Sequence, residues 1–135
     1  MKTLIVEDEL TSRVVLRELL KRYGPPLVVM NGIQAVEAVQ AALSANDPFN
    51  LICLDIEMPE MDGQEALKQI RKLEEDAGLT RETRARVIMT SAHSDRDNVV
   101  EAIQSQCDHF LVKPIDGRAL LDELRRFGLI PALPK

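Results

Sequence analysis

Leu51-Ile52-Cys53-Leu54-Asp55-Ile56-Glu57-Met58-Pro59-Glu60-Met61-Asp62-Gly63 is the stretch from which the architecture of this chain can be worked out. Its apolar run is short and is bounded by turn residues, which predicts a strand that is buried on both faces. Strands of this kind belong to parallel sheets that are covered by helices on both sides. Asp55 would stand at the carboxyl end of the strand, where open α/β sheets bind their ligands. Pro59 and the turn at 61–63 would separate this strand from the next helix.

Composition limits the classes of protein to which this chain can belong. The chain has 135 residues, of which 45% are hydrophobic and 29% are charged, and this predicts one compact domain. The net charge of −5 argues against a surface that binds nucleic acid directly. The apolar run at the amino terminus is too short for a signal peptide, and no apolar run is long enough to span a membrane. Cys53 and Cys107 lie in apolar patterns without metal-type spacing, so we expect a cytoplasmic protein with reduced, buried thiols.

Apolar runs alternate with amphipathic segments along the whole chain. Four more runs predict buried strands, at residues 4–6, 27–30, 87–89 and 109–112. Helical spacing of apolar residues predicts five helices, over 10–21, 33–43, 64–74, 95–103 and 116–127. This alternation predicts an α/β fold with a doubly wound, five-stranded parallel sheet that is flanked by five helices.

The third and fourth helices lead to more detailed expectations. On the third helix the charged residues Lys68, Arg71 and Glu74 are expected to form a solvated face. The polar segment 76–86 is either a mobile loop or an extension of that helix, and its composition favours a surface loop. The fourth helix would be capped by one of two polar residues and carried by three apolar ones: Ser94 or Asp95, and Val99, Val100 and Ile103.

Polar side chains follow four of the predicted strands. Because the carboxyl ends of parallel strands meet at one edge of a sheet, we expect Glu7 and Asp8, Asp55, Ser91 and Lys113 to face one crevice. Three carboxylates against one ammonium group leave a residual charge of about −2 that repels itself. A divalent cation would cancel this charge, and oxygen ligands of this kind suit Mg²⁺.

Phosphoryl transfer to a carboxylate is the chemistry that suits this set. Asp55 would be the nucleophile, Lys113 and the metal would neutralise phosphoryl oxygens, and the Ser91 hydroxyl would donate to one of them. Each residue alone also has a structural explanation, as a strand cap, a loop lysine, a helix cap or an exposed acidic turn. Their joint occurrence at successive strand ends favours the functional interpretation.

Four segments resemble the signature blocks of response-regulator receiver domains of the CheY-like superfamily. They are Ile5-Val6-Glu7-Asp8-Glu9, residues 54–63, Thr90-Ser91-Ala92 and Leu111-Val112-Lys113-Pro114-Ile115. The resemblance implies a flavodoxin-like sheet with strand order 2-1-3-4-5. It also implies a stand-alone receiver domain over residues 1–127 with a short tail at 128–135.

The resemblance implies a role for each residue of the crevice. Asp55 would accept a phosphoryl group from the phosphohistidine of a sensor histidine kinase or of a histidine phosphotransfer protein. Asp8 and Asp55 would ligate Mg²⁺ directly, Glu7 mainly through water, and Glu57 through its backbone carbonyl. Lys113 would bind the phosphoryl group.

A second part of the resemblance concerns the response to phosphorylation. Ser91 would be the switch hydroxyl, and Phe110 the aromatic ring that changes rotamer when Ser91 moves towards the phosphoryl group. His93 and Glu57, two residues after Ser91 and Asp55, could tune hydrolysis.

The resemblance predicts a two-component signalling switch rather than an enzyme, although it would assist its own phosphorylation and autodephosphorylation. A downstream effector, or a second copy of the chain on activation, would bind the face formed by the fourth helix, the fifth strand and the fifth helix. The apolar tail would dock on that face, extend it, or fray as an inert end.

Three alternatives stay open at this point. The chain could be a phosphorelay shuttle, or a degenerate receiver that serves as a scaffold without being phosphorylated. A phosphatase of the haloacid dehalogenase type would use Asp55 and Glu57, but it has no role for the pair Glu7-Asp8.

Overall fold

The computed structural model describes residues 1–58, 60–93 and 96–134. One parallel sheet has the strand order β2-β1-β3-β4-β5. Its strands are β1 (Thr3–Val6), β2 (Leu27–Val29), β3 (Leu51–Asp55), β4 (Arg86–Ser91) and β5 (His109–Val112). The main helices are α1 (Leu10–Leu20), α2 (Gly32–Ser44), α3 (Gly63–Asp76), α4 (Arg96–Gln104) and α5 (Gly117–Arg126). The predicted fold class and strand order are therefore confirmed, whereas the expected roles of Pro59, Ser94 and Asp95 fall outside the described residues.

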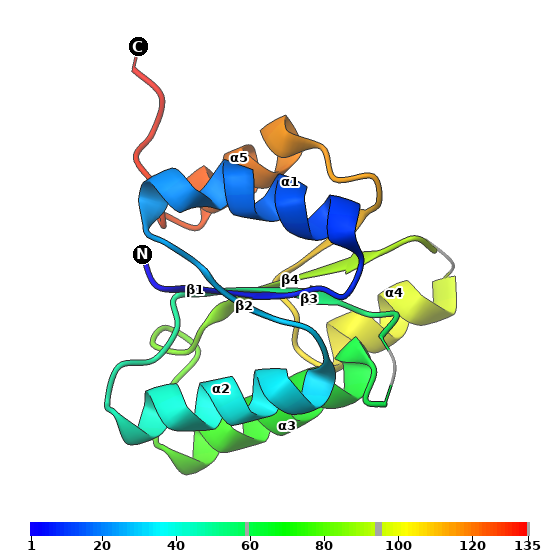
Figure 1. The fold of residues 1–135 in the computed structure, drawn as a ribbon. Helices are drawn as coiled ribbons and strands as arrows, with labels where there is room; N and C mark the ends of the chain where they lie inside the picture. The colour runs from blue at the N-terminus through cyan, green and yellow to red at the C-terminus, as the bar shows by residue number, and fades with distance from the viewer. Residues whose placement is uncertain (59, 94–95, 135) are drawn as a thin grey trace.

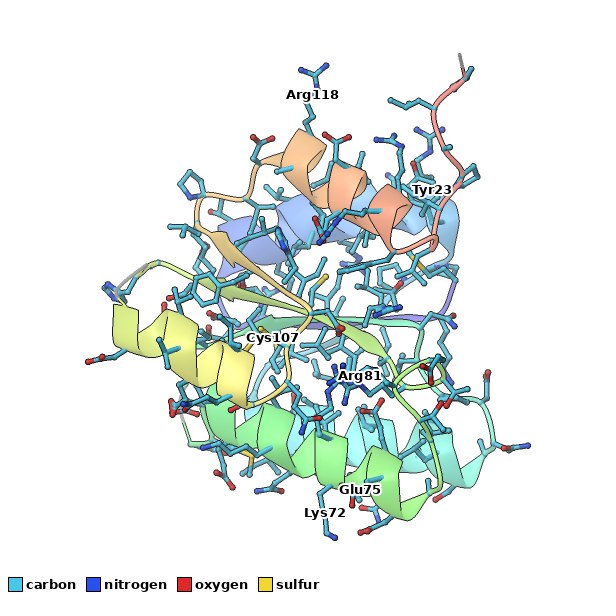
Figure 2. The ribbon with its side chains drawn as sticks, turned by 180° about the vertical axis from the view of Figure 1, so that it is seen from behind. Tyr23, Lys72, Glu75, Arg81, Cys107 and Arg118 are labelled. Atoms are coloured by element: carbon cyan, nitrogen blue, oxygen red, sulfur yellow. The ribbon has the colours of Figure 1, made fainter. Side chains whose placement is uncertain are left out.

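Helices cover both faces of the sheet (Figure 1). α1 and α5 lie on one face, and α2, α3 and α4 lie on the other. On α3 and α5 the side chains of Lys72, Glu75 and Arg118 point away from the sheet (Figure 2). The sheet is therefore the middle of three layers, as the buried apolar strands predict.

The two cores follow from the alternation of side chains along each strand. In β1, Leu4 and Val6 belong to the core beneath α2 and α3, whereas Ile5 belongs to the core beneath α1 and α5. In β3, Ile52 and Leu54 face the first core, whereas Leu51 and Cys53 face the second. Both strands are buried along their whole length, which confirms the interpretation of their apolar runs.

The turn after β3 is so tight that only glycine fits its last position. A Cβ atom added to Gly63 would lie 2.3 Å from the backbone oxygen of Asp55. The Gly63 amide donates to the carbonyl of Ile56 at 2.9 Å, and the Asp62 carboxylate caps α3 by accepting from the Glu65 amide. The start of α3 is thereby held against the end of β3, next to Asp55.

Two expectations about helix faces were only partly right, since Lys68 on α3 is exposed as expected. Arg71 and Glu74 on α3 are 7% and 3% exposed, so they are buried instead of solvated, because they pair with each other and with groups from other elements. On α4, Ala102 is buried and Val99 is half-buried, whereas Val100 and Ile103 are 40% and 66% exposed. The segment after α3 consists of turns, which confirms the predicted loop.

The two cysteines differ in burial, and the tail is partly packed against the domain. Cys53 is buried and unbonded, and burial raises the pKa of its thiol to about 12. Cys107 is also unbonded but only half-buried, so the expectation of a buried thiol is met only in part. In the tail, Ile130 enters the core beneath α1 and α5, whereas Leu133 is exposed. Among the described residues, no helix has the length and apolar character needed to cross a membrane.

Candidate functional site

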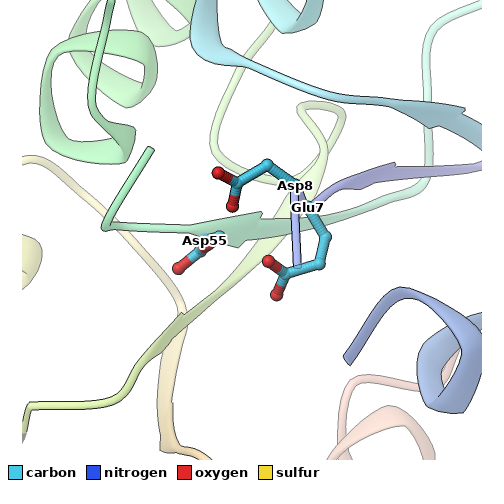
Figure 3. A group of neighbouring side chains, drawn as sticks. All are labelled: Glu7, Asp8 and Asp55. Carbon is cyan, nitrogen blue, oxygen red and sulfur yellow. The ribbon is translucent and has the colours of Figure 1, made fainter. Parts of the chain in front are cut away.

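Four strand ends bring the predicted residues together at one edge of the sheet. Glu7 and Asp8 follow β1, Asp55 and Ser91 end β3 and β4, and Lys113 follows β5. The carboxylates of Glu7, Asp8 and Asp55 gather at this edge (Figure 3), and each offers an oxygen within 4.8 Å of those of the other two. Parallel topology explains this convergence, because all five carboxyl ends point the same way.

Lys113 connects the end of β5 to two of these acids. Its Nζ lies 2.8 Å from Oε1 of Glu7 and 3.3 Å from Oδ2 of Asp55. Its backbone amide donates to the carbonyl of Ser91 at 2.8 Å, which continues the pairing of β4 and β5 by one residue. The lysine is therefore directed at the acids and is not a solvated loop residue.

Burial makes the negative charge of this site costly. The side chains of Glu7 and Asp55 are 1% and 2% exposed, and Asp8 is exposed. Burial, reinforced by the hydrogen bond and the charge of Glu7, raises the pKa of Asp55 to about 8, although Lys113 acts in the opposite direction. Burial also lowers the pKa of Lys113, but its contacts with Glu7 and Asp55 outweigh this effect and leave that pKa raised.

The donor set suits a hard divalent cation. Glu7, Asp8 and Asp55 offer only oxygen ligands, and the single ammonium group of Lys113 balances only part of their charge. Mg²⁺ binds to few carboxylates and retains water ligands, which fits a site with one open, exposed side at Asp8.

Ser91 is fully buried and hydrogen-bonded to Glu57. Its hydroxyl donates to Oε2 of Glu57 at 2.7 Å, and the Ala92 amide donates to Oε1 of the same carboxylate at 2.9 Å. The His93 amide donates to Oγ of Ser91 at 2.9 Å. Sequence reasoning assigned Glu57 a backbone ligand role and an effect on hydrolysis, and it missed this contact between side chains.

Phe110 lies on the same face of the sheet as Ser91. The register pairs Phe110 with Met89 and pairs Val112 with Ser91, and alternation along β4 and β5 puts all four side chains on one face. Phe110 is half-buried and packs against the core on that side. The two residues of the predicted switch thus lie on one face of two neighbouring strands, and the change of rotamer stays a prediction.

A hollow lies beside Lys113. It has a volume of about 420 Å³ and lies between the first turns of α1 and the segment after β5. Ala92 and Lys113 contribute to its wall, together with Ser12 and Ile115. The site is therefore open to another molecule on the side of α1.

Residues 3–125 match the family described as the response regulator receiver domain. The chain is 34% identical over 127 residues to the chemotaxis protein CheY of Bacillus subtilis (strain 168), covering 93% of this chain and 95% of that protein. It is 35% identical over 130 residues to the response regulator protein FleR of Pseudomonas aeruginosa, and there it spans only 24% of the relative.

Solved structures agree with this match. The receiver domain of the histidine kinase CKI1 from Arabidopsis thaliana, complexed with Mg²⁺ and BeF₃⁻, has a TM-score of 0.80 and 30% identity, with 94% of this chain and 89% of that chain covered. The receiver domain of Ssk1, in its complex with the histidine phosphotransfer protein Ypd1 of Saccharomyces cerevisiae, has a TM-score of 0.80 and 26% identity, with 98% and 92% covered. The chain belongs to the response regulator receiver domains, and it is a receiver of phosphorelay signalling and not a classical enzyme.

Proposed function

We propose that this receiver accepts a phosphoryl group on Asp55 from a phosphohistidine and then changes its affinity for a partner. The observation that carries the proposal is the contact of Lys113 with Glu7 and Asp55 at an edge where Asp8 completes an acid cluster. A lysine held against a buried carboxylate is poised to neutralise a group that becomes attached to that carboxylate. Asp55 is the member of the cluster that ends a central strand.

The reaction would replace a phosphorus–nitrogen bond by a phosphorus–oxygen bond. An oxygen of Asp55 attacks phosphorus, and the imidazole nitrogen of the donor keeps the electron pair and takes up a proton. Lys113 stabilises the charge on the phosphoryl oxygens, and the Ser91 hydroxyl donates to one of them. Attack needs an ionised Asp55, so the raised pKa of this carboxyl makes positive charge at the site a requirement.

A bound Mg²⁺ would supply that positive charge. We assign its ligands to Asp8 and Asp55, with Glu7 acting mainly through water and Glu57 through its backbone carbonyl. The spacing of the carboxylate oxygens, all within 4.8 Å, supports the part played by the three acids. The same residues would assist hydrolysis of the phosphoryl group, so we also infer autodephosphorylation.

Partners would approach from two sides. A histidine kinase or a histidine phosphotransfer protein would dock over the hollow that Lys113 lines, and Lys113 itself contacts Asp55. For output we propose the face of α4, β5 and α5, where Val100, Ile103 and Val112 are 40%, 66% and 44% exposed. Exposed apolar residues that gather on one face are typical of a protein interface. A downstream effector, or a second copy of this receiver, would cover them.

We infer a receiver domain over residues 1–127 and a tail at 128–135, in a cytoplasmic protein. Ile130 supports a tail that is anchored at its start, because it is 6% exposed and lies in the core beneath α1 and α5. The tail would therefore stabilise the domain and not cover the output face.

Phosphorylation of Asp55 is tested by intact mass after incubation with acetyl phosphate and Mg²⁺. We expect the wild type to gain one phosphoryl group and Asp55→Asn to gain none. Asp122→Asn is the matched control, because Asp122 has a 61% exposed side chain on α5, away from the site. Equal uptake by Asp55→Asn and the wild type would refute the proposal. The decay of the modified mass over time measures autodephosphorylation in the same experiment.

A further inference from the structure

Two hydrogen-bond donors at the end of β4 converge on a single anionic group. The Ser91 hydroxyl donates to one oxygen of the Glu57 carboxylate at 2.7 Å, and the Ala92 amide donates to the other oxygen at 2.9 Å. Each oxygen therefore has its own donor, which is the arrangement of a small anion-binding site. Glu57 itself is exposed, so it is not part of a packed core.

The Ser91 hydroxyl has two acceptors within hydrogen-bond distance. Its Oγ lies 2.7 Å from Oε2 of Glu57 and 2.8 Å from the carbonyl oxygen of His93. A hydroxyl group donates only one proton, and a carboxylate is the stronger acceptor. The proton of Ser91 is therefore directed to Glu57, while the lone pairs of the same oxygen accept from the His93 amide.

The phosphoryl group of the proposed function needs the same donors. Lys113 contacts Asp55 on one side, and Ser91 ends the strand that pairs directly with β3. A phosphoryl group on Asp55 has several oxygens to satisfy, and the Ser91 hydroxyl is the donor assigned to one of them. Two anions cannot share one hydroxyl proton, so Glu57 and the phosphoryl group compete.

We propose that Glu57 is an internal latch, meaning a carboxylate that occupies Ser91 and Ala92 in the unphosphorylated receiver and must leave before a phosphoryl group can use them. The inference deepens the proposed function and rests on it. Glu57 stabilises the unphosphorylated position of the segment after β4, because it links this segment to the one after β3 by two hydrogen bonds. The latch sets how strongly phosphorylation must act before Ser91 moves.

Removal of the latch should strengthen the binding of a phosphoryl mimic. We expect Glu57→Ala to bind beryllofluoride, at a fixed Mg²⁺ concentration, at least about tenfold more tightly than the wild type, since hydrogen bonds to a charged group no longer have to be broken. Glu57→Gln should have a smaller effect, because its amide keeps one acceptor oxygen and loses the other. NMR titration of ¹⁵N-labelled protein measures the affinities.

Two controls distinguish an effect of the negative charge of Glu57 from an effect of its hydrogen bonds. Glu60→Gln removes the same charge from an exposed residue of the same loop and should leave the affinity unchanged. In a double-mutant cycle with Ser91→Ala, the gain from Glu57→Ala should shrink, because one of the two contested donors is absent. A gain of equal size with and without Ser91 would show a general charge effect and would overturn the latch.

A second measurement uses the unliganded protein. The Ala92 amide resonance should shift, and its hydrogen exchange should accelerate, in Glu57→Ala but not in Glu60→Gln. An Ala92 amide that is indifferent to Glu57 would overturn the latch without any ligand. Because Glu57 is exposed, loss of folding is not expected, and a thermal unfolding curve for each variant checks this.

The outcomes distinguish the latch from the function on which it rests. If the wild type and the Glu57 variants all fail to bind beryllofluoride while Mg²⁺ is present, the assignment of Asp55 fails and the latch fails with it. If the wild type binds the mimic, Asp55→Asn does not, and Glu57→Ala binds no better than the wild type, the assignment of Asp55 stands and only the latch is refuted.

Discussion

The role proposed for Asp55 needs a negative charge, whereas the surroundings of this side chain oppose one. Its side chain is 2% exposed and its pKa is raised to about 8 by burial and by Glu7. The unfolded chain would release this proton near pH 4. Between these two values the folded protein binds a proton that the unfolded protein has lost, so the free energy of unfolding falls as the pH rises.

The neutral variant Asp55→Asn should therefore be more stable than the wild type at high pH without Mg²⁺. We expect a gain of at least about 1.4 kcal/mol near pH 8 and little difference near pH 4, because one pKa unit corresponds to that free energy. Urea denaturation in the presence of a chelator measures it. A difference that does not vary with pH would contradict the raised pKa of Asp55.

Asp8 is the exposed member of the acid cluster and the clearest test of the metal site. We expect Asp8→Ala to abolish measurable Mg²⁺ binding, because the open side of the cluster loses its ligand. Isothermal titration with MgCl₂ measures this, with Asp122→Ala as the control for an exposed acid elsewhere. Unchanged Mg²⁺ affinity in Asp8→Ala would show that the acid pair is only a surface turn.

Among the elements, a buried ionic network joins α3 to the last residue of the following loop and to the connection from α4 to β5. Arg71 donates through Nη1 to Glu74 at 2.7 Å and to the Ala85 carbonyl at 2.8 Å, and through Nη2 to Asp108 at 3.0 Å. Glu74 accepts from the Ala85 amide at 2.8 Å. These bonds anchor the loop against β4 and against the connection from α4 to β5.

Loss of one partner from this network should destabilise the fold. We expect Arg71→Ala to lower the free energy of unfolding by about 3 kcal/mol, because Glu74 would keep a buried and uncompensated charge. Lys72→Ala, one residue along α3, is the control, since its pair with Asp76 is exposed and should contribute less than about 1 kcal/mol. Equal losses in the two variants, measured by urea denaturation, would show that the network contributes no more than a surface pair.

For the whole molecule, the site lies at one edge of the sheet and the proposed output face runs down β5 from that edge. Ser91 and Phe110 lie on the face of the sheet that α4 covers, so a movement of Ser91 would reach α4 through the ring. Such a movement becomes a signal only if phosphorylation changes the difference in free energy between the two positions of this region.

Hydrogen exchange with and without beryllofluoride tests the direction of the signal. We expect altered exchange in 91–93 and 96–112 and at the start of α5, and a changed environment of the Phe110 ring by NMR. Asp55→Asn should show neither change. Effects confined to the loop at 77–85 and to α2 and α3 would show that this receiver signals through another face.

The layers of the fold and the position of the candidate site follow from patterns along the chain. Short apolar runs buried on both faces require a parallel sheet between helices, and polar residues at the ends of such strands must meet at one edge. These patterns were sufficient to predict which side chains meet there: Glu7, Asp8, Asp55, Ser91 and Lys113. Local pattern was sufficient here because all parallel strands run in the same direction, so residues that directly follow different strands lie close together in space.

The pairing of polar side chains inside the fold does not follow from such patterns, because it depends on contacts between distant parts of the chain. Glu57 reaches Ser91 across 34 positions of the chain, and Arg71 reaches Asp108 across 37, so no helical or strand spacing reveals either contact. The exposure of Ile103 has a similar cause, because the distance of α4 from the sheet depends on how the whole layer packs and the smaller Ala102 makes the buried contact. Periodicity reports which face of an element is apolar, whereas the burial of a charge depends on partners that folding brings from elsewhere.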